Sequence, residues 1–180
     1  MFQLIGWDKH LENWQVAHRA GFLDPIFKGL TYMGAYGAVW LALAALLALA
    51  LRRPQIFLWT LVADVLGELV SDGFKAAIPR ARPHLDVLVA RPHGHSFPSG
   101  HATTSFACAT VLAQFAPRLR VPLLLLAAAI AWSRVYVGVH YPLDVLAGVL
   151  LGTAIGFAAA TTLPQLAASR RRSRPAPRAG

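Results

Sequence analysis

A run of twenty residues without a charged side chain, residues 32–51, most limits what this chain can fold into. As a helix, such a run measures about 30 Å, the thickness of the hydrocarbon core of a bilayer. The whole chain agrees, because 56% of its 180 residues are hydrophobic and only 14% are charged, against about 25% in a soluble domain. Its mean hydropathy is +0.50. The composition therefore predicts a membrane protein.

Four more apolar segments follow, so the chain is expected to form an all-α, polytopic transmembrane helix bundle of about five spans. They are residues 56–77, 99–115, 121–137 and 142–163. Gly148, Gly152 and Gly156 in the last segment have the spacing of a close helix contact. Four prolines in residues 79–98 predict a loop.

Residues 1–30 are predicted to add an N-terminal interfacial helix. Leu4, Trp7, Leu11 and Trp14 recur at helical spacing, with polar residues elsewhere on the wheel. Such a helix either lies in the headgroup layer or packs on top of the bundle, and both can hold. We expect residues 1–168 to form one membrane-embedded domain. Residues 169–180 are basic and proline-rich, which predicts a disordered cytoplasmic tail.

The net charge of +9 comes from short basic clusters between apolar runs, which suits orientation in a membrane better than binding to nucleic acid. If five spans alternate, Arg52, Arg53, Arg118, Arg120 and the C-terminal arginines share one side. The positive-inside rule makes that side, with the C-terminus, cytoplasmic. The opposite, extracytoplasmic face of the cell membrane still receives five cations, whose natural role is to bind an anion. They are Lys75, Arg80, Arg82, Arg91 and Arg134.

Alternation of the spans also brings four of their ends together on that outer face. Lys75 and Arg134 lie where the second and fourth spans end, and Ser99 and Asp144 lie where the third and fifth spans begin. An arginine can donate a pair of hydrogen bonds to phosphate oxygens, and a lysine adds a point charge. Lys75, Arg82 and Arg134 are therefore predicted to hold a phosphate. Arg80 and Arg91 are interpreted as headgroup anchors.

Asp64, Glu68 and Asp72 share one face of the segment 56–77 and should point inward. They are either internal hydrogen-bond partners, or Asp72 and Glu68 position Lys75 or a neighbouring cation.

Ser99 precedes an apolar helix and is an N-cap candidate, and the free amides of that first turn form an anion site. Gly100 lets the backbone approach the anion closely. His101 then lies beside the anion as a general acid.

His140 and Asp144 form the second predicted catalytic group. Asp144 falls in the first helical turn after Pro142, from where its carboxylate can reach one ring nitrogen of His140. The other nitrogen is then free to attack phosphorus. In isolation these residues would be a loop histidine and a helix-start residue, but beside Arg134 and His101 they predict a phosphohistidine.

The histidines of the loop offer a weaker alternative. His84, His93 and His95 with Asp86 match no known metal-ligand spacing, so contacts with the substrate are the milder interpretation. Cys108 lies alone in an apolar run and is expected to be a small buried hydrophobe.

Three motifs in this region resemble those of the type 2 phosphatidic acid phosphatase (PAP2) superfamily. Lys-x6-Arg-Pro matches residues 75–83, Pro-Ser-Gly-His matches residues 98–101, and Ser-Arg-x5-His-x3-Asp matches residues 133–144, all without a substitution.

The resemblance implies hydrolysis of a phosphomonoester or diphosphate without a metal or other cofactor. It implies that His140 is the nucleophile, Asp144 its orienting group and His101 the acid that later activates water. Lys75, Arg82, Ser99, Gly100 and Arg134 would bind the phosphoryl group. The expected substrate is a lipid diphosphate, with undecaprenyl diphosphate favoured and phosphatidylglycerophosphate and phosphatidate as rivals. A non-catalytic lipid-phosphate binding or transport protein is the alternative from another class.

Overall fold

The computed structural model describes residues 6–172, and every regular element in that range is a helix. The predicted all-α class is therefore confirmed for this part of the chain. In chain order the elements are α1 (Gly6–Ala17), η1 (Gly21–Leu23), α2 (Asp24–Met33), η2 (Ala35–Gly37), α3 (Ala38–Ala50), α4 (Gln55–Ala77), α5 (Gly100–Phe115), η3 (Pro117–Leu119), α6 (Arg120–Tyr136) and α7 (Pro142–Arg172).

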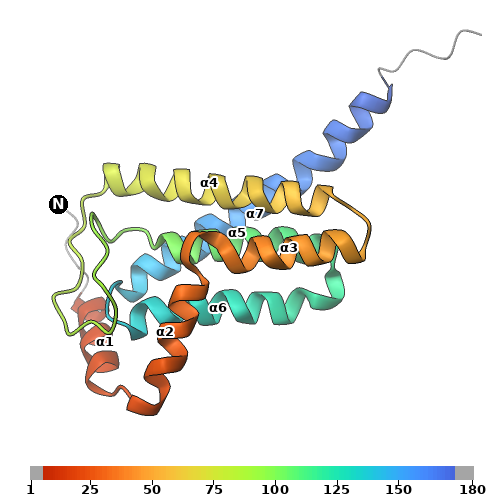
Figure 1. Ribbon diagram of the computed structural model, residues 1–180. Helices are drawn as coiled ribbons and strands as arrows, with labels where there is room; N and C mark the ends of the chain where they lie inside the picture. Colours follow the sequence, from red (N-terminus) through yellow and green to blue (C-terminus); the bar gives the residue numbers. More distant parts are fainter. Residues whose placement is uncertain (1–5, 173–180) are drawn as a thin grey trace, which may run out of the picture.

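Helix α5 lies at the centre of the bundle, with α3, α4, α6 and α7 packed around it (Figure 1). Most of its residues are small and buried, which lets the neighbouring helices approach closely. Its buried hydroxyls donate to carbonyls one turn earlier, Thr103 to Ser99 (2.9 Å) and Thr104 to Gly100 (3.1 Å). These bonds satisfy polar groups that have no access to water. Cys108 is fully buried, as the sequence indicates.

The three glycines of α7 form the predicted close contact, and α5 is the helix they face. A Cβ atom added to Gly148 would lie 2.7 Å from the Ser99 carbonyl oxygen, and one added to Gly152 would lie 2.2 Å from that of Thr103. At Gly156 the corresponding distance to the Ala107 carbonyl oxygen is 2.7 Å. The two helices therefore touch backbone to backbone along three turns.

The single continuous helix predicted for residues 32–51 is wrong. Helix α2 ends at Met33, and α3, which begins only at Ala38, runs at 67° to the segment Gly21–Met33. Gly37, at the break, has a φ of +64°, a left-handed conformation that glycine adopts without strain. A Cβ atom there would also lie 2.1 Å from the Asp64 carboxylate. An uncharged run with glycines thus forms a bent pair of helices.

Two helices of the described residues are long and apolar enough to cross a bilayer, Pro117–Tyr136 and Pro142–Thr162. The bent pair adds a third span if it is counted as one. The acidic residues of α4 and the short length of α5 keep these helices out of that set. The predicted number of five spans is therefore not confirmed.

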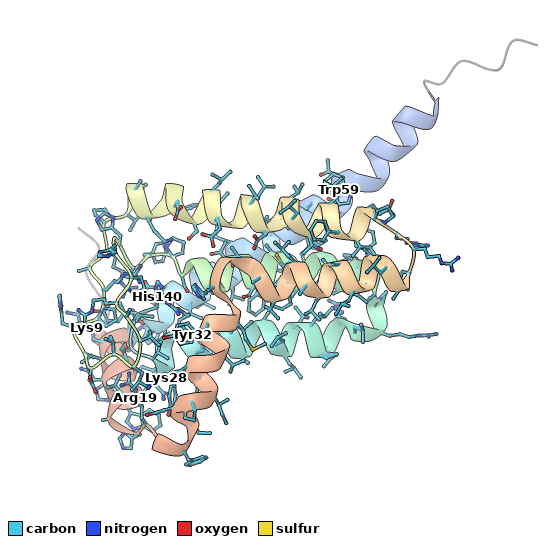
Figure 2. All side chains as sticks on the ribbon, viewed as in Figure 1. Lys9, Arg19, Lys28, Tyr32, Trp59 and His140 are labelled. Atoms are coloured by element: carbon cyan, nitrogen blue, oxygen red, sulfur yellow. The ribbon has the colours of Figure 1, made fainter. Side chains whose placement is uncertain are left out.

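The convergence of helix ends can be followed in Figure 1. Helices α1 and α2, the segment 78–99 and the α6–α7 connection gather at one end of the bundle. The α3–α4 and α5–α6 connections lie at the other end. His140 is at the first end and Trp59 toward the second (Figure 2). The last turns of α4 and α6 and the first turns of α5 and α7 thus share one end.

Candidate active site

A cavity of about 500 Å³ opens at the end of the bundle where these helix ends meet. Six of the eight predicted site residues line it: Lys75, Arg82, Gly100, His101, Arg134 and His140. The other lining residues are Ala35, Asp64, Glu68, Pro92 and His93. The remaining predicted residues, Ser99 and Asp144, are fully buried beside Gly100 and His140 respectively. All eight predicted site residues therefore lie in or against one cavity.

His140 lies in the short connection between α6 and α7 and is 3% exposed. Its Nε2 is 3.1 Å from Nη1 of Arg82, and its Nδ1 is 3.5 Å from Oδ2 of Asp144. Because a guanidinium can only donate, Nε2 must be the unprotonated nitrogen and Nδ1 carries the proton. Burial lowers the pKa of His140 to about 4, and Asp144 opposes this effect. The imidazole is therefore neutral at neutral pH, and the lone pair of Nε2 faces the Arg82 guanidinium.

Asp144 occupies the first turn of α7, as predicted, and both its oxygens are engaged. Oδ2 accepts a hydrogen bond from the backbone N–H of Tyr141 (3.0 Å) and faces His140. Oδ1 accepts one from the Arg80 guanidinium. The backbone carbonyl of Asp144 accepts from the N–H of Ser99 at 3.0 Å, which ties the start of α7 to the start of α5.

The three predicted phosphate-binding cations differ in how far they are already engaged. Arg82 donates to the carbonyls of Val139 (3.1 Å) and Gly94 (3.2 Å), and burial lowers the pKa of its guanidinium. Lys75 is 2.9 Å from the Asp72 carboxylate. Arg134 is 3% exposed, and its side chain makes no hydrogen bond to any residue in the range 6–172. Its guanidinium is available to an anion in the cavity.

Ser99 stands at the N-cap position of α5, but its side chain makes no capping hydrogen bond. Its buried Oγ has no hydrogen-bond partner within the described residues. A buried hydroxyl without a partner costs free energy unless a ligand satisfies it. Next to it, Lys75 Nζ lies 3.4 Å from where a Cβ of Gly100 would be. The first turn of α5 thus faces a cation and offers a hydroxyl, which suits a bound anion.

The break between α2 and α3 brings the chain against His101. A Cβ atom on Gly34 would lie 3.1 Å from the His101 ring and 2.4 Å from Ile130. Only a residue without a side chain fits there, so Gly34 allows η2 to pass close to the imidazole. Ala35 of η2 then lines the cavity.

The acidic residues of α4 divide between the cavity and the surface. Asp64 is buried and Glu68 half-buried, and both line the cavity as expected from their shared face. Asp72 is exposed, which contradicts the prediction that it points inward. It lies in the last two turns of α4, and its carboxylate pairs with Lys75. This pair agrees with the interpretation that Asp72 positions Lys75.

The interpretation of Arg80 as a headgroup anchor is wrong. Its side chain is 2% exposed and forms ion pairs with two buried carboxylates, those of Asp8 and Asp144. Arg91, by contrast, is exposed and donates to the Leu85 carbonyl at 3.1 Å. The sequence did not distinguish these two arginines. The partner that makes Arg80 different, Asp8, lies 72 positions away in the chain.

Glu12, one turn after Asp8, is a second carboxylate that the sequence did not single out. It is fully buried, and neither oxygen has a hydrogen-bond partner among the described residues. Burial raises the pKa of Glu12 from 4.5 to about 8, although Arg19 opposes the rise. Between pH 4.5 and about 8, the folded chain therefore keeps a proton on Glu12 that the unfolded chain has lost.

This difference in proton binding predicts that stability falls as pH rises from about 4.5 to about 8 and then levels off. Glu12→Gln removes the contribution, so the variant should lose less thermal stability than the wild type over that window. The measurement is the Tm of the detergent-purified protein from about pH 5 to about pH 9. Lys9→Gln, an exposed change on the same helix, should follow the wild type. Identical curves for Glu12→Gln and the wild type would contradict the assignment.

The loop histidines do not assemble a metal site. Across residues 6–172, no group of three or more His, Cys, Asp or Glu side chains could hold a metal ion. His93 lines the cavity, and His95 Nδ1 donates to the Lys75 carbonyl at 2.7 Å. His84 and Asp86 are exposed and are not among the residues that line the cavity, so the interpretation as substrate contacts does not extend to them.

Comparison with known proteins agrees with this site. The family model described as the PAP2 superfamily matches residues 56–167. The chain belongs to the PAP2 superfamily. The matched PAP2 region begins in α4 and includes all eight predicted site residues, while α1 to α3 lie outside it.

Among curated PAP2 relatives, an undecaprenyl-diphosphatase of Sulfolobus acidocaldarius is 34% identical over 136 residues, which span 71% of this chain and 66% of the relative. A decaprenylphosphoryl-5-phosphoribose phosphatase of Mycobacterium tuberculosis is 37% identical over 133 residues, 72% of this chain and 74% of the relative. The crystal structure of a transmembrane PAP2 type phosphatidylglycerolphosphate phosphatase from Bacillus subtilis superposes with a TM-score of 0.76 at 27% identity. The superposition covers 93% of this chain and 87% of the Bacillus subtilis chain. These likenesses and the apolar helices indicate a membrane location.

Proposed function

We propose that this protein hydrolyses a lipid diphosphate, with undecaprenyl diphosphate as the best candidate, through a phosphohistidine at His140. Its family and its phosphatase-named relatives identify it as a membrane lipid phosphatase, a hydrolase that acts on phosphate esters. The observation that carries the mechanism is a single cavity lined by His101, His140 and three cations.

In the first step Nε2 of His140 attacks phosphorus, and the bond from phosphorus to the leaving oxygen breaks. The nitrogen gains the phosphoryl group while Nδ1 keeps its proton, so the ring becomes positively charged. The Asp144 carboxylate beside Nδ1 stabilises that charge. His101 donates a proton to the leaving oxygen.

In the second step His101, now unprotonated, takes a proton from water, and the oxygen attacks the phosphorus of the phosphohistidine. The N–P bond breaks, inorganic phosphate leaves and His140 is regenerated. Throughout, Lys75, Arg82 and Arg134 balance the charge on the phosphoryl oxygens. The free Ser99 hydroxyl and the Gly100 amide complete the donor set.

The proposed substrate follows from the site and the relatives together. Three cations suit a group with more than one negative charge, and the Sulfolobus acidocaldarius relative is named an undecaprenyl-diphosphatase. Phosphatidylglycerophosphate is the main rival, because the Bacillus subtilis structure is named for it. Phosphatidate is a further candidate, and a lipid-phosphate binding or transport protein is the alternative without turnover.

We also propose that five segments cross the cytoplasmic membrane, with the cavity on the extracytoplasmic face and the C-terminus in the cytoplasm. The arginines of the α3–α4 and α5–α6 connections support this orientation by the positive-inside rule. The membrane-embedded domain would comprise residues 1–168. The disordered tail proposed for residues 169–180 lies mostly outside the described residues, which end at Arg172 in α7.

A panel of lipid phosphates tests the proposal. The purified full chain in detergent with EDTA should release phosphate from undecaprenyl diphosphate with a higher kcat/KM than from phosphatidylglycerophosphate or phosphatidate. A preference for either of the latter would transfer the assignment to that rival. Binding of the lipids without phosphate release would favour the non-catalytic alternative.

A further inference from the structure

Helix α1 has its apolar residues outside and its acids inside. Trp7 and Trp14 are 50% and 53% exposed, whereas Asp8 and Glu12 are fully buried. A helix that packs on a protein in water shows the opposite arrangement. An unpaired buried charge is costly, so Asp8 requires a partner inside the protein, whereas Glu12 holds a proton instead. The inner face of α1 therefore needs an explanation beyond contact with lipid.

The partner of Asp8 is Arg80, which bridges it to the carboxylate of Asp144. Nη1 of Arg80 donates to Oδ1 of Asp144 at 2.5 Å, and Nη2 donates to Oδ2 of Asp8. The guanidinium lies over the Tyr141 ring, 4.3 Å from its centroid. All three charged side chains are at most 2% exposed.

Asp8 also holds the backbone that carries Asp144. Its Oδ1 accepts a hydrogen bond from the N–H of Leu143 at 2.9 Å, in the first turn of α7. One carboxylate of α1 thus contacts both the arginine that binds Asp144 and the residue that precedes Asp144. These contacts come from a helix that the PAP2 family match does not include.

We propose that Asp8 and Arg80 are positioning residues, which hold the Asp144 carboxylate in the orientation that His140 needs. This inference rests on the proposed function, in which His140 is the nucleophile. With Oδ1 bound to Arg80 and Oδ2 bound to the Tyr141 amide, the carboxylate plane cannot rotate. Oδ2 is then kept on the side of His140 Nδ1.

The charges explain why two carboxylates share one arginine. Arg80 paired with Asp144 alone would neutralise the negative charge that supports a phosphorylated, positively charged imidazole. Asp8 gives Arg80 a second counter-ion, so the three groups together keep one negative charge beside His140. A lysine in place of Arg80 would supply one point charge and could not donate along two directions in a plane.

The test compares Arg80→Lys and Asp8→Asn with two matched controls, Arg91→Lys and Asp86→Asn, whose side chains are exposed at the same end. Phosphate release from undecaprenyl diphosphate is measured for each full-length variant in detergent. We expect kcat to fall about 10- to 100-fold in both variants, with KM within about threefold of the wild type, because the phosphate-binding cations are untouched. Both controls should keep wild-type kinetics.

A second measurement separates positioning from a general loss of structure. If Arg80 acts through Asp144, adding Arg80→Lys to Asp144→Asn should change kcat by less than about threefold. A full additional loss in that background would overturn the proposal, as would wild-type kcat in both single variants. Unfolding of both single variants, seen as a collapse of Tm, would likewise overturn it in favour of a structural role. Failure of the wild type to release phosphate from any lipid phosphate would instead refute the proposed function.

Discussion

Replacing His140 by alanine is expected to lower phosphate release by about 10⁴-fold or more, since this residue is the one proposed to form the covalent intermediate. The contacts of His140 support the proposed role as nucleophile. Asp144 faces Nδ1, Arg82 donates to Nε2, and burial keeps the ring neutral with its pKa lowered to about 4. The measurement is kcat for phosphate release, together with rapid acid-free quenching to trap a phosphorylated protein.

The matched control is His84→Ala, because His84 is an exposed histidine of the adjoining loop. It should keep wild-type activity, and it should form the trapped phosphoprotein that His140→Ala lacks. Full activity in a folded His140→Ala protein would end the assignment of the nucleophile. A trapped phosphoprotein in that variant would show that another residue accepts the phosphoryl group.

Replacing Gly152 by alanine is expected to destabilise the protein by about 3 kcal/mol or more, because the new methyl group meets backbone and not a flexible side chain. The added Cβ would lie 2.2 Å from the Thr103 carbonyl oxygen and 3.0 Å from the Ala107 amide nitrogen. Neither atom can move without shifting α5. A loss of this size corresponds to a fall in Tm of roughly 6–12 °C.

Gly73→Ala is the matched control for this prediction. Gly73 also lies inside a helix, but nothing approaches within 4 Å of where its Cβ would be. Alanine has the higher helix propensity, so this change should stabilise the protein by about 0.5–1 kcal/mol. The two Gly→Ala changes should therefore move Tm in opposite directions. A Gly152→Ala protein as stable as the wild type would mean that α5 and α7 do not touch backbone to backbone.

The parts of the fold that could be predicted are those encoded by local pattern. The start of α5 after Ser99 and the start of α7 at Pro142 agree with the predicted segments to within one residue. Both helices begin at a strong start signal, which is a capping residue for α5 and a proline for α7. The convergence of the site residues followed from alternation of the helices. Their catalytic roles stay a proposal until turnover is measured.

The parts that could not be predicted depend on contacts between distant residues. The bend at Gly37 is favoured by the left-handed backbone there and by Asp64 from the next helix, neither of which is visible in an uncharged run. The burial of Arg80 needs two carboxylates, one of them 72 positions away. An arginine near a membrane surface is usually an anchor, and only tertiary structure distinguishes this one.

The backbone contact between α5 and α7 affects how the site responds when the surrounding bilayer deforms. A bilayer changes thickness and tilts its helices as its lipid composition and temperature vary. The helix that starts at Gly100 and the helix that follows His140 are locked side by side over three turns, so such a deformation must move them as one body. The distance between their two imidazoles is therefore insulated from the elasticity of the surrounding lipid, and distortion is left to the outer helices.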